Sequence, residues 1–172
     1  MAHGLDTILD AAEMLRDRED ILFLTIGEGA EYARLKRQVA ERGLDNVRML
    51  GQQPKELMPH FWSISDCSLV LLRDLELFTT VIPSKIFESM AMKKPIVLGV
   101  RGEVQEIIEA AGCGICIEPE HSQMLADVVQ RMADNPLETV SLGDKGEHYV
   151  AAHFDRRALA KKFAVTFDQI TR

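Results

Sequence analysis

Residues 21–29 read Ile-Leu-Phe-Leu-Thr-Ile-Gly-Glu-Gly, and this stretch decides the expected fold. Its first six residues form an apolar run broken only by Thr25, which is typical of a strand buried on both faces of a sheet. Gly27 and Gly29 then favour a tight turn at the end of the strand. Strands of this kind occur almost only in parallel sheets covered by helices on both sides, so the run predicts an α/β protein.

The segments on either side of this run alternate between helix and strand patterns. Apolar side chains at helical spacing predict a helix that begins at Leu5. Further helices are expected over residues 30–42, 54–63, 83–92 and 102–111, and further strands over residues 47–50, 67–72, 95–99 and 114–118. This order predicts a doubly wound, Rossmann-like parallel sheet, in which ligands bind beyond the carboxyl ends of the strands.

Three more helices are expected in the last third of the chain, where they would cover the sheet. One apolar stripe consists of Met124, Leu125, Val128, Val129 and Met132, and a second consists of Leu159, Phe163, Phe167 and Ile170. With 47% hydrophobic and 27% charged residues, residues 1–172 have an ordinary globular composition and fit one domain.

Acidic residues outnumber basic ones by 27 to 20, which gives a formal net charge of −7. Such a charge repels polyanions and argues against nonspecific nucleic-acid binding. The sequence has no run of about 18 consecutive apolar residues and does not start with a secretion signal. We therefore expect a cytoplasmic protein.

Cys113 and Cys116 form a Cys-x-x-Cys pattern, which can be a redox or metal motif. The sequence has no second such pair, and its histidines show no metal-ligand spacing, so no metal is expected. Because the residues around Cys116 alternate like a buried strand, both cysteines are expected to be small apolar core residues.

A loop before the helix expected at residues 83–92 carries most of the candidate chemistry. Pro83 in the first turn leaves the amides of Ser84 and Lys85 free at the positive end of the helix dipole, which suits a phosphate. Lys85 adds a cation, and the hydroxyl groups of Thr79, Thr80 and Ser84 add hydrogen-bond donors.

Glu88 lies one turn further along this helix. Its carboxylate can accept hydrogen bonds from a vicinal diol such as ribose, each contributing roughly 1.5 to 3 kcal/mol because the acceptor is charged. The spacing also fits a purely structural interpretation, in which Ser84 caps the helix, Lys85 is solvated and Glu88 pairs with a nearby lysine.

Five segments together resemble the C-terminal domain of family-4 (group 1) retaining glycosyltransferases, which have the GT-B fold of two Rossmann-like halves. They are residues 5–12, 27–29 and 46–51, the run Pro-Ser-Lys-Ile-Phe-Glu-Ser-Met-Ala-Met-Lys-Lys-Pro-Ile-Val at 83–97, and Gly102-Glu103. The resemblance covers nearly the whole chain. It is closest to the branch that makes bacterial surface polysaccharides, similar to the colanic-acid and fucosamine transferases.

The resemblance implies that the chain binds a UDP- or GDP-sugar. The resemblance also implies that the amides at Ser84 and Lys85 hold the distal phosphate and that Glu88 binds the ribose hydroxyls. The family places another glutamate on the donor sugar, and Thr80 stands at that position here. A neutral hydroxyl lacks the carboxylate's charge, so either this branch reads its sugar differently, for example a 6-deoxy or N-acetylated one, or another acid such as Glu76 reaches the site.

The resemblance also places base recognition after the strand at residues 47–50. The base-binding candidates are Leu50, Gln52 and Lys55, each of which also fits an ordinary strand-end or helix-cap role. The candidates at the rim of the donor site are Gly27, Glu28 and Glu103. Glycine suits a turn in any case, and Glu103 also suits the first turn of a helix on electrostatic grounds alone.

The family begins this domain with a strand and a glycine-containing loop that brings basic residues to the diphosphate. This chain starts at the helix that follows, and near that loop it retains only His3. We therefore expect the first, central strand to be missing, the first helix to be unanchored, and backbone groups to be unpaired in a central slot. Donor binding by this chain is accordingly expected to be weaker than by the full enzyme.

The predicted function is retaining transfer of a hexosyl group from the nucleotide sugar to a saccharide or lipid-linked acceptor, without a cofactor. This chain would supply donor binding only, and its partners would be the nucleotide sugar, the enzyme's own N-terminal domain and the acceptor. A peripheral position at the inner membrane is compatible with a lipid-linked acceptor. Two alternatives stay open: a UDP-sugar 2-epimerase-like enzyme, whose acidic and histidine set is not found, and a flavodoxin-like binding module, whose acidic residues the strand before Gly27 does not supply.

Overall fold

The computed structural model describes the backbone of residues 3–170; the side chains at 158, 159, 162, 165 and 168–170 lie outside the described set. Its strands are β1 (Phe23–Thr25), β2 (Val47–Met49), β3 (Ser68–Leu71), β4 (Ile96–Gly99) and β5 (Gly114–Cys116). Every pair that these strands form is parallel, which confirms the predicted α/β class.

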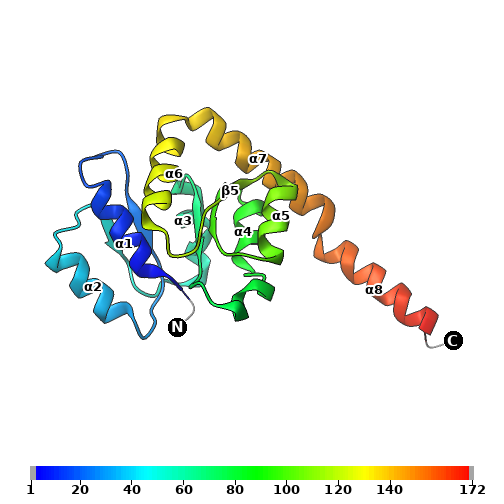
Figure 1. Ribbon diagram of the computed structural model, residues 1–172. Coiled ribbons are helices and arrows are strands. Elements are labelled where there is room, and N and C mark those ends of the chain that lie inside the picture. Colours follow the sequence, from blue (N-terminus) through cyan, green and yellow to red (C-terminus); the bar gives the residue numbers. More distant parts are fainter. Residues whose placement is uncertain (1–2, 171–172) are drawn as a thin grey trace.

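Helices alternate with these strands and continue beyond β5 (Figure 1). The α-helices are α1 (Leu5–Met14), α2 (Tyr32–Glu41), α3 (Met58–Ile64), α4 (Lys85–Ala91), α5 (Glu103–Ala111), α6 (Ser122–Asp134), α7 (Pro136–His153) and α8 (Arg156–Ile170), and the 3-10 helices are η1 (Lys55–Leu57) and η2 (Glu76–Thr80). The helix expected over residues 54–63 is divided into η1 and α3, because Pro59 has no amide hydrogen to donate to the Lys55 carbonyl. Helix η2 occupies part of a segment expected to be a loop.

The strands form two sheets, as expected when the central strand of one parallel sheet is missing. β1 pairs with β2, and β3, β4 and β5 form the second sheet in that order. Within residues 3–170, no strand joins β1 to β3. In a doubly wound sheet the first strand lies between the second and the fourth, so the division falls where the missing first strand was expected.

Helix α1 is firmly packed, contrary to the expectation that it would be unanchored. Its buried apolar residues are Ile8, Leu9, Ala11 and Ala12, and Leu15 directly after the helix is buried as well. They belong to one hydrophobic cluster with Phe23 and Val47 of the first sheet and with Leu71 and Val97 of the second. Helix α6 adds Leu125, Val129 and Met132 to this cluster, which confirms the apolar stripe predicted there. The apolar residues of α1 are therefore buried although no described strand lies ahead of the helix. Together, α1 and α6 join the two sheets into one body.

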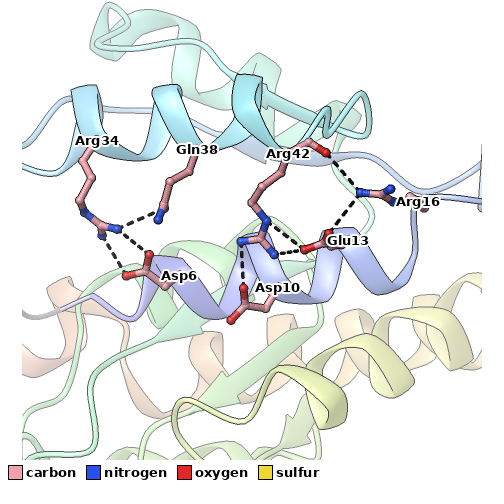
Figure 2. A network of polar contacts seen from close by, with 7 residues as sticks. All are labelled: Asp6, Asp10, Glu13, Arg16, Arg34, Gln38 and Arg42. Carbon is pink, nitrogen blue, oxygen red and sulfur yellow. Dashed lines mark hydrogen bonds and ion pairs between the residues drawn. The ribbon is translucent and has the colours of Figure 1, made fainter.

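A ladder of ion pairs joins α1 to α2 (Figure 2). Arg34 of α2 donates two hydrogen bonds to Asp6 of α1, at 2.7 and 2.9 Å. At the other end, Arg42 contacts Asp10 at 2.9 Å and also contacts Glu13. The hydrogen bond from Arg34 lowers the pKa of Asp6, and the hydrogen bond from Arg42 lowers that of Glu13. Because these pairs are largely exposed, they orient α2 more than they stabilise the core.

The opposite face of the second sheet is covered by α4, α5 and α7. A second cluster lies there, made of Val70, Leu72, Ile86, Met90, Ile96, Leu98, Val100, Val104, Ile108, Ala111 and Cys113. Cys113 is fully buried and Cys116 half-buried, and both are free thiols, which confirms the interpretation of this pair as core residues. This cluster contains no residue of β1 or β2.

Helix α8 does not cover the sheet, so that prediction was wrong. It projects from the end of α7 away from the rest of the molecule (Figure 1). Phe163 is 67% exposed and Phe167 56% exposed, while the side chains of Leu159 and Ile170 lie outside the described residues. The apolar stripe of α8 does not pack on the second sheet, because α4, α5 and α7 already cover that face of the sheet.

The ladder between α1 and α2 predicts a specific acid sensitivity. Because the folded-state pKa values of Asp6 and Glu13 lie below their ordinary values of 3.8 and 4.5, the stabilisation is present above those values and is lost as the pH falls through the lowered ones. We expect an Asp6→Asn, Glu13→Gln double variant to lose less melting temperature between about pH 6 and pH 3 than the unchanged protein, measured by circular dichroism.

The matched control for this experiment is an Asp17→Asn, Glu19→Gln double variant. Both residues are exposed and neither makes an ion pair within the described part of the chain. This variant should follow the unchanged protein, and identical pH curves for the two double variants would contradict the assignment.

Candidate functional site

The predicted site residues follow the carboxyl ends of the strands. Gly27 follows β1, Leu50 follows β2, and Gly102 follows β4, while η2 and the start of α4 follow β3. Parallel strands within a sheet end at the same edge, so this edge is where the fold places a ligand.

Helix α4 begins at Lys85, so Pro83 lies before the helix and not in its first turn as predicted. The reason is a tight turn, in which Ile86 N donates to Pro83 O and Phe87 N to Ser84 O, each at 3.1 Å. Among the described residues, the amides of Ser84 and Lys85 make no hydrogen bond and the Ser84 side chain does not cap the helix. Because α4 has seven residues, its dipole is short, and these two amides with the Lys85 cation are the main positive groups.

Lys85 is half-buried, and burial lowers the pKa of its ammonium group. It makes no ion pair within residues 3–170. The pKa of His3, ahead of α1, is lowered by burial and then by the neighbouring Lys85 charge. His3 also forms a hydrogen bond with the backbone of Leu71, the last residue of β3. Among the described residues neither side chain has a carboxylate partner, so the Lys85 cation, with His3 near it at the end of β3, suits an anion.

Glu88 is exposed on α4 and makes no ion pair with any described side chain. The next residue, Ser89, points inward instead, where its hydroxyl is fully buried and donates to Ser68 Oγ at 2.8 Å. Neither the Ser84 cap nor the Glu88–lysine pair of the structural interpretation is present in the described chain. The carboxylate is therefore available to a ligand.

Helix η2 places Thr79 against the start of α5. A β-carbon on Gly102 would lie only 1.9 Å from the Thr79 carbonyl oxygen, and the φ angle of Gly102 is +91°. Because Thr79 lies against Gly102, the end of η2 and the start of α5 are neighbouring segments of the rim. Thr80 and Glu103, which lie on these two segments, are both exposed. Glu76, the alternative acid, is exposed at the first residue of η2.

The rim and base candidates of the first sheet form a separate group. Gly27 N donates to Gly51 O at 2.7 Å, and a β-carbon on Gly51 would lie 3.1 Å from Glu28 Oε1. Leu50, Gln52 and Lys55 are exposed beside this turn. No described hydrogen bond or ion pair joins this group to Lys85 or Glu88, so the structure does not bring the two halves of the predicted site into direct contact.

Four charged residues at this edge were not selected by the sequence analysis. Arg101 pairs with Asp74 at 3.3 Å, Arg73 pairs with Glu120 at 3.8 Å, and Asp74 N donates to Glu120 Oε2 at 2.9 Å. They link the loops after β3, β4 and β5. Their one sequence signal is position, because each follows closely after a predicted strand.

A hollow of about 290 Å³ lies elsewhere on this edge, lined by Arg101, Gln105, Cys116, Ile117, Glu118 and Met124. No predicted site residue lines it, so it gives no support to the predicted donor site. Among the described residues, histidine, cysteine, aspartate and glutamate side chains form no group that could hold a metal ion. Over the same residues, no helix has the length and apolar character needed to cross a membrane.

Residues 2–149 match the family described as Glycosyl transferases group 1, and the chain belongs to this family. Over 125 residues it is 30% identical to WcaI of Escherichia coli strain K12, which is assigned as a colanic acid biosynthesis glycosyl transferase. That region is 71% of this chain and 30% of WcaI. The chain spans less than half the length of the curated relatives it matches.

Two solved structures show the same fold. HepE of Anabaena in complex with UDP-glucose superposes with a TM-score of 0.82 at 21% identity, over 97% of this chain and 45% of HepE. The C-terminal domain of LpcC, a glycosyl transferase group 1 family protein of Francisella tularensis, gives a TM-score of 0.74 at 20% identity, over 90% of this chain and 80% of that domain. The prediction of a Rossmann-like C-terminal half of a GT-B fold is confirmed.

The close approach of Thr79 to Gly102 predicts that Gly102→Ala is strongly destabilising. The new β-carbon overlaps a backbone oxygen, and alanine is strained at this φ, so we expect a loss of roughly 3 kcal/mol in the free energy of unfolding. Gly43→Ala is the matched control, because Gly43 has a φ of +60° with nothing within 4 Å of the added carbon, and about 1 kcal/mol is expected there. Urea denaturation measures both values, and equal losses would show that the Thr79 contact is unimportant.

Proposed function

We propose that this chain is the donor-binding half of a retaining glycosyltransferase that takes a UDP- or GDP-sugar. The observation that carries the proposal is the exposed carboxylate of Glu88 one turn from the half-buried cation of Lys85, neither of which forms an ion pair within the described part of the chain. Membership of the group 1 family supports it, as does the likeness of the fold to a protein solved with UDP-glucose.

The start of α4 is the proposed diphosphate site. Two amides, at Ser84 and Lys85, are free to donate, and Lys85 supplies a positive charge that no carboxylate neutralises in the described chain. Burial of Lys85 strengthens its attraction for an anion, because water screens the interaction less. Stabilising the departing nucleoside diphosphate in this way would lower the barrier to sugar transfer.

Glu88 is the proposed ribose ligand. A carboxylate can accept two hydrogen bonds from a vicinal diol. When no cation is paired with the carboxylate, no cation competes with the diol for its oxygens. Its position one helical turn beyond Lys85 is compatible with a ribose attached to the phosphates held there.

The remaining proposed contacts are to the base and to the transferred sugar. Leu50, Gln52 and Lys55 are exposed at the end of β2 and would meet the base, with Gly27 and Glu28 at the rim beside them. Thr80 and Glu103 would face the transferred sugar. Thr80 offers a neutral hydroxyl where the family has a glutamate, which favours a sugar that needs no charged acceptor at that point.

The acceptor would be a saccharide or a lipid-linked sugar in the synthesis of a surface polysaccharide, bound by an N-terminal domain outside this chain. WcaI and its assignment to colanic acid biosynthesis support this pathway class. The epimerase-like and flavodoxin-like alternatives gain nothing from the family match. The enzyme would act in the cytoplasm, at the inner membrane if its acceptor is lipid-linked.

The Glu88 assignment is tested by titrating UDP into the protein in a calorimeter. We expect Glu88→Ala to raise the dissociation constant roughly 10- to 100-fold, which corresponds to losing one or two hydrogen bonds to a charged acceptor. Glu41→Ala is the control, because Glu41 is an exposed glutamate of α2 without an ion pair in the described structure. Both variants should keep the melting temperature, and an unchanged affinity in Glu88→Ala would refute the ribose assignment.

A second titration tests whether the chain binds a donor nucleotide as strongly as a complete enzyme would. Among the described residues, His3 has the one basic side chain that lies ahead of α1, and it offers the diphosphate few contacts from that side. We expect UDP and GDP to bind this chain with dissociation constants in the micromolar range or weaker. Submicromolar binding would show that nothing ahead of α1 is needed.

A further inference from the structure

The backbone of Glu120, between β5 and α6, has a left-handed conformation with a φ angle of +57°. Residues with a β-carbon are disfavoured there, and glycine is the residue that adopts this conformation without steric cost. A residue in such a conformation is held there by its surroundings, and residues of this kind cluster at functional sites. The contacts of the Glu120 side chain explain why a glutamate stands at this position.

One other described residue that is not glycine has a positive φ angle, and its role is structural. Lys93 follows α4 with a φ angle of +56°, at the position where a left-handed residue commonly ends a helix. Its ammonium group lies 2.9 Å from Glu147 and 3.4 Å from Asp144, both on α7. Lys93 thus joins α7 to the end of α4 that lies opposite Lys85.

The Glu120 carboxylate reaches the loop that follows β3, 46 residues earlier in the chain. Its Oε2 atom accepts a hydrogen bond from the Asp74 amide at 2.9 Å, and its Oε1 atom lies 3.8 Å from Nε of Arg73. A β-carbon on Gly4 would lie 3.8 Å from Cγ of Glu120, so the side chain also lies against the residue that precedes α1. One side chain therefore connects three segments that meet at the carboxyl edge of the second sheet.

Asp74 begins the segment of residues 74–80, which contains η2. Its amide is bound by Glu120, and its carboxylate pairs with Arg101 at 3.3 Å. Among the described residues, Glu120 and Arg101 provide the side chains that bond to Asp74 from outside the segment. The ion pairs are largely exposed and add little to stability, whereas the hydrogen bond from a backbone amide to a carboxylate fixes where the chain runs.

The far end of this segment depends on its start. Phe78 packs against the second hydrophobic cluster, and Thr79 lies against Gly102. A 3-10 helix of five residues has little stability by itself, so the place of η2 depends on the contacts at both of its ends. Thr80, the last residue of η2, is therefore placed in part by Glu120.

We propose that Glu120 is a positioning residue, whose carboxylate fixes the start of segment 74–80 and thereby places Thr80 at the sugar end of the donor site. The ordering of this segment is a property of the protein without a ligand. Its consequence for the sugar rests on the proposed function, in which Thr80 faces the transferred sugar. This role accounts for a glutamate at a position whose backbone favours glycine.

The test removes the carboxylate and the backbone strain together, in a Glu120→Gly variant. Phe78 N donates to Leu75 O at 2.9 Å and Val81 N donates to Phe78 O at 3.3 Å, so these two amides report on η2. We expect both to exchange hydrogen roughly three- to tenfold faster, measured by NMR, because the segment loses a hydrogen bond to a charged acceptor. The melting temperature should stay unchanged or rise by up to about 3 °C, because glycine adopts this φ angle without strain.

Two variants serve as controls for the exchange measurement. Lys93→Gly relieves the same kind of strain at the other end of α4, so exchange at Phe78 and Val81 should stay unchanged. Glu120→Gln keeps an oxygen that can accept from the Asp74 amide, so exchange should stay within about twofold of the unchanged protein.

Two results would overturn the positioning role. One is equal exchange at Phe78 and Val81 in Glu120→Gly and in the unchanged protein. The other is a loss of several degrees in the melting temperature of Glu120→Gly with faster exchange throughout the chain, because Glu120 would then stabilise the whole fold and not this segment.

Calorimetric titrations with UDP and UDP-glucose test the consequence for the sugar. We expect Glu120→Gly to keep the dissociation constant of UDP within about twofold and to weaken UDP-glucose relative to UDP by roughly threefold or more. An unaltered ratio would overturn the link between this segment and the sugar. Failure of the unchanged protein to bind UDP or GDP would refute the donor site itself, while the exchange result would still decide the role of Glu120.

Discussion

This structure depends on one constraint: a buried parallel strand needs a hydrogen-bonded neighbour on each of its two edges. β4 has two neighbours, and its residues Ile96–Gly99 are all buried. Within residues 3–170, β1 and β3 have one neighbour each, and the sheet is divided between them. Burial of apolar side chains by α1 and α6 bridges that division on one face, because hydrophobic packing, unlike backbone pairing, does not require a particular neighbour.

The same parallel arrangement gathers the loops after the strands at one edge, and the charges there fall into two kinds. Arg73 and Arg101 are paired with Glu120 and Asp74 and so hold loops to one another. Lys85 and His3 have no such partner in the described chain, and Glu88 also stands alone. Charges left unpaired at the edge where this fold binds ligands single out the start of α4.

Membership of the glycosyl transferases group 1 is why we propose a nucleotide sugar for these groups, since its diphosphate would meet a cation and its ribose diol a carboxylate. Thr80 departs from the family pattern at the position proposed to face the transferred sugar. The diphosphate and ribose groups of the proposed site therefore follow the family, while the sugar-reading part does not.

The sequence by itself determined the order of strands and helices, their parallel arrangement, and the place of Cys113 and Cys116 in the core. These follow from local patterns: apolar runs, helical stripes, and glycine or proline at turns. It was less successful where a long-range contact decided the result. The packing of α1, the projection of α8, the approach of His3 to the Lys85 charge and the Arg73–Glu120 pair depend on which surfaces are already covered, and no local pattern records that. The gap in the sheet was expected from the sequence. Tertiary packing alone decided that the hydrophobic cluster on one face spans this gap while the cluster on the other face does not. The reason is that the side chains on the two faces of one strand contact different helices.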